Sequence, residues 1–159
     1  MAPADLLMPL EGQRDETLKV LDDLSDSDLD LVERGSGWTV RQLLAHIAVA
    51  EMGEAFFIRM AAQGDVIHMS EEERDGFNDG EAEKYEGWDV ARLRQELQDA
   101  RDSLREVFAG LTEEDLDSAI RWPEWPARTI RSSIPYMLEH EDSHVDQVRR
   151  ALGRGNGRD

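Results

Sequence analysis

The sequence predicts an all-α four-helix bundle, with a short extra helix or loop between the second and third long helices. Two observations favour this fold class. Apolar residues recur at helical spacing through four long segments, and no segment of the chain shows a convincing strand pattern. We place residues 1–152 in one domain and expect the glycine-rich residues 153–159 to form a disordered tail.

The first two long helices have recognisable starts. The first is expected over Ala4–Leu24, where leucines form an apolar stripe and Pro9 marks either a kink or the true start. An acidic stretch, Ser25–Asp30, reads as the helix end and a loop. In the second helix Thr39 is a natural N-cap, and apolar residues then recur at helical spacing up to about Ala62.

The middle of the chain predicts a short helix and a long one. Ser70 and the glutamate three residues later resemble a capping box, so a short helix is expected from there to about Tyr85. Asp89 caps the third long helix, which runs to about Leu111 and carries Arg101 on a wetter face together with its other polar residues.

Two prolines interrupt the helical pattern near the end of the chain. They bias Arg121–Pro126 toward extended shapes, so this segment is not expected to be helical. Thr129 then caps the last long helix, which runs to Leu152 and ends at Gly153.

The charge of the 159-residue chain is strongly negative. Asp and Glu number 36 against 18 Lys and Arg, which gives a formal net charge of −18. This balance argues against nucleic acid and against an anionic membrane surface as partners, because both are bound mainly through Lys and Arg. Lys19 and Lys84 are the only lysines. Acidic, lysine-poor surfaces suit solubility in high salt, but a GC-rich genome also replaces lysine with arginine.

The chain has no cysteine, which excludes disulfides, thiolate metal ligands and a cysteine nucleophile. We see no signal-peptide pattern at the N-terminus and no apolar stretch approaching the length of a membrane helix. We therefore expect a soluble, cytoplasmic protein.

Chemistry can be carried by the histidines. His140 and His144 are four residues apart, which places both imidazoles on one face of the last helix, where they can share a metal ion. His46 lies among core positions of the second helix. Taken alone, it is more often a hydrogen-bonded core histidine than a ligand. The fourth, His68, lies in a loop and is expected at the surface.

His140–His144 also matches H-E-x-x-H, the pattern of zinc metalloproteases. That class normally adds a sheet and a further downstream ligand, and neither is predicted here. The interpretation depends on whether Glu141 can reach a water on the metal.

Two stretches resemble the DinB-like family, which is grouped with thiol-dependent S-transferases and mycothiol-dependent maleylpyruvate isomerases. Gly37–Ala48 is similar to the start of the second helix of that family, and Met137–Arg149 looks like its last helix. The resemblance extends from about Leu6 to Leu152.

The resemblance implies a four-helix bundle with a divalent metal held by His46, His140 and His144. Zinc is the expected metal, although nitrogen ligands also suit nickel, iron(II) or cobalt. A low-molecular-weight thiol would be activated there to attack a small electrophilic substrate, in a transferase or isomerase. The alternatives are a hydrolase that uses activated water and a non-enzymatic metal-binding bundle. A homodimer is also plausible.

Neighbouring side chains complete the expected site, in which no catalytic residue is assigned. Gln147 shares a helix face with His144, and Asn78 could line the pocket, so we assign both to cofactor binding. The carboxylates Glu51 and Glu141 are expected on solvated surfaces, because acidic residues are mostly exposed. Trp38 either rims the pocket or packs over the core.

Overall fold

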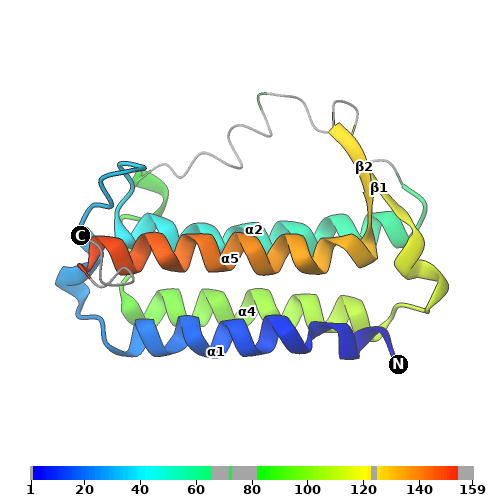
Figure 1. Ribbon diagram of the computed structural model, residues 1–159, viewed down its shortest axis with the longest axis horizontal. Helices are drawn as coiled ribbons and strands as arrows, with labels where there is room; N and C mark the ends of the chain where they lie inside the picture. The colour runs from blue at the N-terminus through cyan, green and yellow to red at the C-terminus, as the bar shows by residue number, and fades with distance from the viewer. Residues whose placement is uncertain (1, 66–71, 73–81, 123–124, 154–159) are drawn as a thin grey trace.

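The computed structural model describes residues 2–65, 72, 82–122 and 125–153, and labels follow Figure 1. Four long helices, α1, α2, α4 and α5, form a bundle in which α2 packs against α4 and α5, and α1 packs against α5 and, less closely, α4 (Figure 1). The predicted fold class is therefore confirmed. The helices span Met8–Asp22 (α1), Val40–Ala62 (α2), Val90–Ala109 (α4) and Ile130–Ala151 (α5).

The four helices do not simply alternate in direction along the chain. Along the colour gradient of Figure 1, α2 and α4 run the same way and α1 and α5 run the opposite way. The end of α2 at Ala62 and the start of α4 at Val90 therefore lie toward opposite ends of the bundle. In a simple up-down-up-down bundle, helices that follow one another would run in opposite directions.

Short 3₁₀ helices flank the long ones. Pro9 falls at the start of α1, so it marks the true beginning of that helix rather than a kink; the preceding turn is 3₁₀. Of the short helix expected from Ser70 to Tyr85, the described part shows a 3₁₀ turn at its end, and residues 66–71 and 73–81 lie outside the described residues. The 3₁₀ segments are Pro3–Leu7 (η1), Asp26–Asp30 (η2), Ala82–Tyr85 (η3) and Glu114–Asp117 (η4).

The N-caps predicted for three of the long helices are present, whereas the capping box predicted at Ser70 lies outside the described residues. Thr39 accepts a hydrogen bond from the backbone N–H of Gln42, and Asp89 and Thr129 accept from the N–H groups three residues after them. Each satisfies a backbone donor that the first helical turn leaves without a partner. These caps fix where α2, α4 and α5 begin, and so which faces turn inward.

A β-hairpin between α4 and α5 corrects the expectation that the chain has no strand. Strands β1 (Ala119–Trp122) and β2 (Trp125–Thr129) pair antiparallel, with Ile120 opposite Arg128 and an irregularity before Trp122. The sequence signal was the pair of prolines, which favour extended backbone. In a two-stranded sheet both strands are edges, so Pro126 is tolerated although it lacks an N–H.

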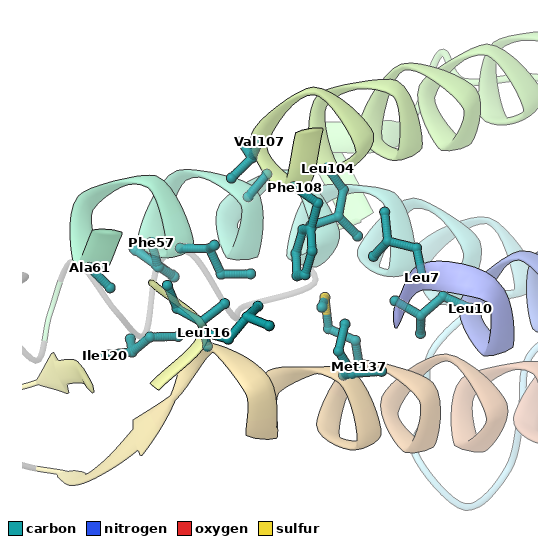
Figure 2. Packing of buried hydrophobic residues seen from close by; sticks show 14 residues of the cluster. Leu7, Leu10, Phe57, Ala61, Leu104, Val107, Phe108, Leu116, Ile120 and Met137 are labelled. Atoms are coloured by element: carbon teal, nitrogen blue, oxygen red, sulfur yellow. The ribbon is translucent and has the colours of Figure 1, made fainter. Parts of the chain in front are cut away.

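The apolar core consists of two clusters, one toward each end of the bundle. Figure 2 shows the cluster at the hairpin end, where Leu104 and Phe108 of α4 face Leu10 of α1 and Met137 of α5. The second cluster includes Leu21, Leu44, Leu97 and Val145. Among the described residues, no helix is both long and apolar enough to cross a membrane.

Candidate metal centre

Three histidines from two helices meet at the boundary of α2 and α5, where His46 is buried and His140 and His144 are half-buried. His46 of α2 faces His140 and His144 of α5, with Nε2 of His46 3.1 Å from Nε2 of His140. One ring nitrogen from each histidine lies within 4.8 Å of the others. Two nitrogens bound tetrahedrally to zinc at about 2.0–2.1 Å lie about 3.4 Å apart, so this donor set fits a divalent ion with little rearrangement.

The surroundings keep all three imidazoles neutral near pH 7. Burial, with the neighbouring histidines, lowers the pKa of His46 from 6.5 to about 3. Burial and His144 lower the pKa of His140 to about 4. The pKa of His144 is also lowered by burial, and Gln147 offsets this in part. Because a metal binds neutral imidazole, protons hardly compete with it at this pH.

Two partners orient the rings. Nδ1 of His144 lies 2.6 Å from Oε1 of Gln147, so Nδ1 is the donor and Nε2 is left free to bind a metal. The ring of Trp38 stacks on His144 and meets His46 edge-on, with centroids 6.3 and 5.3 Å apart. Trp38 therefore covers one side of the cluster.

A pocket opens on the other side, between α2 and α5, and His140 is the histidine that lines it. Apolar and acidic groups share its wall, and the ring of Tyr136 lies nearly parallel to that of His140, 6.2 Å away. A small molecule in this pocket would therefore lie against a face of the histidine cluster. The lining residues are Ile47, Ala50, Glu51, Glu54, Tyr136, Met137, His140 and Glu141.

A buried layer of charge, which we call the Arg–Glu layer, adjoins the pocket. It consists of Arg14 of α1, Glu51 of α2, Arg101 of α4 and Glu141 of α5, each at most 6% exposed. Arg14 donates to Glu141 at 2.8 and 3.1 Å and to Glu51 at 3.1 Å. Arg101 donates to Glu51 at 2.9 and 3.1 Å. Two positive and two negative charges cancel, so the layer is neutral.

This layer overturns three expectations. Glu51 and Glu141 are not on solvated surfaces, and Arg101 is not on a wet face of its helix; all three are buried. The reason is mutual pairing, which removes the cost of burying an isolated charge. Arg14 and Glu54, which also proved to be buried, were not singled out from the sequence.

The position of Glu141 bears on the metalloprotease interpretation. Its Oε1 accepts from Arg14, and its Oε2 accepts from Arg14 and from the hydroxyl of Thr17 at 2.6 Å. A glutamate held in this way by α1 is poorly placed to take a proton from a nucleophile at the histidines. The H-E-x-x-H spacing here brings two histidines together, but it does not free the glutamate.

Two further residues, Gln147 and Asn78, were assigned to cofactor binding. Gln147 contacts His144. Asn78 lies outside the described residues, and so does His68, which was expected at the surface and not in the site.

Comparison with known proteins agrees with this architecture. YfiT from Bacillus subtilis, described as a probable metal-dependent hydrolase with an unusual four-helix bundle topology, has a similar structure, with a TM-score of 0.75 at 19% identity. The similarity covers 95% of this chain and 87% of YfiT.

Sequence comparison also finds relatives. The uncharacterized protein YuaE of Bacillus subtilis (strain 168) is 25% identical over 144 residues, which cover 84% of this chain and 89% of YuaE. Residues 10–148 match the family described as the DinB superfamily. This match spans α2, the hairpin and nearly all of α5, and with them the three histidines, so the chain belongs to the DinB superfamily.

Proposed function

We propose that this protein binds a divalent metal ion through His46, His140 and His144 and uses it to activate a small nucleophile. The convergence of three neutral imidazoles beside a pocket carries this proposal. Without a metal, His46 and His140 could hydrogen-bond each other at the observed distance. That contact would not explain why His144 lies beside them or why a pocket opens at His140.

A divalent ion held by these three neutral imidazoles would keep its full charge and would supply Lewis acidity, which lowers the pKa of a bound water or thiol. The chain's own residues supply the rest. Gln147 fixes the tautomer of His144, and Trp38 covers one side of the histidine cluster. The pocket beside His140 gives a substrate access to the cluster.

Our more specific proposal concerns which nucleophile the metal activates. A low-molecular-weight thiol, acting in a transferase or isomerase, is the first candidate, and the chain supplies no cysteine of its own. Water, acting in a hydrolase, is the second candidate, because the structural neighbour YfiT is described as a probable metal-dependent hydrolase.

Metal content tests the ligand set directly. Purified protein should hold about one zinc or other divalent ion per chain, and His140→Ala should lose most of it. His68→Ala provides a control that removes the one histidine of the sequence that is not among the proposed ligands. Unchanged metal content in His140→Ala would contradict the proposed set of ligands.

Cobalt-substituted protein separates the two nucleophiles. Thiol titration should produce a new sulfur-to-cobalt absorption band if a thiol binds at the metal. Turnover of an electrophile that requires the thiol supports the transferase. Turnover of esters without any thiol, and no such band, supports the hydrolase. Absence of both activities in metal-loaded protein would indicate a binding protein.

A further inference from the structure

Glu54 lies in the pocket that begins at His140, two helical turns beyond His46 on α2. Its side chain is 10% exposed and forms an ion pair with Arg128 of β2 through Oε1. The guanidinium of Arg128 lies over the ring of Tyr136, 4.2 Å from its centroid. Elements far apart in the sequence therefore build this end of the pocket.

The second carboxylate oxygen of Glu54 has no hydrogen-bond partner in the part of the chain that the structure describes. Oε2 is buried and accepts no hydrogen bond from any described residue. Burial raises the pKa of Glu54, and Arg128 offsets this in part. An orphaned buried acceptor is costly, and native structures rarely keep one without a reason.

The other two carboxylates of the pocket differ sharply from Glu54. Glu51 accepts on both oxygens from Arg14 and Arg101. Glu141 accepts on both oxygens from Arg14 and Thr17. Neither has to take a ligand to satisfy its oxygens, so Glu54 is the pocket carboxylate with spare acceptor capacity.

We propose that Glu54 determines substrate specificity by accepting a hydrogen bond from an N–H group, best a protonated amine, on the substrate in this pocket. An ionised carboxylate only accepts, so it selects a donor and rejects a carboxylate or phosphate. A charged donor makes the stronger bond. Ile47, Ala50 and Met137 offer apolar wall for a short alkyl chain.

Access to Oε2 needs only a local adjustment. The terminal torsion of glutamate is broad, so the carboxylate can turn toward a ligand and keep its place on α2. Because this rotation moves both oxygens, a small turn that keeps Oε1 near the guanidinium of Arg128 is favoured. That the reacting end of the substrate lies at the histidines rests on the function proposed above, whereas the amine contact does not involve the metal.

Three small probes of equal length test the contact: n-butylammonium, n-butanol and butyrate. Their affinities are measured by NMR chemical-shift titration, in about 0.5 M NaCl to screen the field of the acidic surface. Wild-type protein should bind butylammonium about tenfold more tightly than butanol, and butyrate least. Glu54→Gln should reduce the ammonium preference to less than about twofold.

Glu139→Gln is the matched control, because it makes the same change of charge at an exposed position of α5. Equal binding of the three probes, no binding at all, or a preference that survives in Glu54→Gln overturns the proposal. A preference that Glu139→Gln also removes overturns it too, since the effect would then be that of net charge.

Arg128→Gln gives a test in the opposite direction, and it serves if Glu54→Gln fails to fold. Glu54 then loses its cationic partner, so at a pH high enough to keep Glu54 ionised the affinity for butylammonium should rise. An unchanged or lower affinity contradicts the proposal. Each titration is repeated on zinc-free protein, where the preference for butylammonium should persist. The proposed metal site is tested by metal content and the Glu54 contact by these titrations, so one proposal can fail without the other.

Discussion

Neutral histidine in the folded state makes the stability of the metal-free protein depend on pH. The unfolded chain binds protons on these residues near the ordinary pKa of 6.5, whereas folded His46 and His140 resist protonation to about 3 and 4. At a pH below 6.5 and above these folded-state pKa values, the unfolded state therefore binds more protons on these histidines than the folded state does. Stability therefore falls as the pH falls through this window, and it is unaffected by these groups above about pH 7.

We expect the unfolding free energy of chelator-treated protein to drop between pH 6.5 and 5. Each histidine that stays neutral contributes about 1.4 kcal/mol per pH unit. Glu54 acts in the opposite direction, since its pKa is raised, but it is one group against three. Urea unfolding at several pH values measures the slope, which His46→Asn should reduce. A flat profile across this window would contradict the prediction.

Spacing alone predicted the histidine pair of α5, because i and i+4 share a helix face. It could not place His46 opposite that pair, since this depends on how α2 and α5 pack; the family resemblance supplied that placement. Glu51 and Glu141 were wrongly predicted to be exposed, because a general preference of acidic residues for solvent was applied residue by residue. Their partners come from other helices, and no local pattern shows this.

The Arg–Glu layer takes one charged residue from each long helix and lies between the two apolar clusters. Each member stands on the apolar stripe of its helix, as Arg101 does between Leu97 and Leu104. A charge on the buried stripe of all four helices was therefore a readable signal in the sequence. The layer aligns the helices along their length, because any slip would separate the paired charges.

Breaking the Arg–Glu layer should destabilise the fold strongly. Glu141→Leu leaves Arg14 with one carboxylate instead of two, and we expect a loss of about 3 kcal/mol or more. The adjacent, exposed Asp142→Asn should stay within about 0.5 kcal/mol. Adding Arg14→Leu to Glu141→Leu should recover part of the loss, because the Glu51–Arg101 pair then remains balanced. Thermal and urea unfolding measure all three, and additive losses would exclude the coupling.

At the scale of the whole molecule, the charges of the Arg–Glu layer cancel, so the net −18 is carried by the residues outside that layer, most of them exposed. Like charges on a surface repel and destabilise the compact state, and salt screens this repulsion. Salt also weakens exposed ion pairs such as Arg92–Glu96, but each of these contributes only about 0–1 kcal/mol. With twice as many acids as bases, repulsion should dominate.

We therefore expect NaCl to stabilise the protein. Raising the salt from about 0.05 to 0.5 M shortens the Debye length severalfold, so the midpoint of urea unfolding should move to higher urea. The buried Arg–Glu layer is little screened and should not respond, so Glu141→Leu should shift by the same amount as wild type. A variant with two exposed acids of α5 neutralised, Glu139→Gln with Asp142→Asn, should respond less. If NaCl leaves the midpoint unchanged or lowers it, the acidic surface is not an adaptation to high salt.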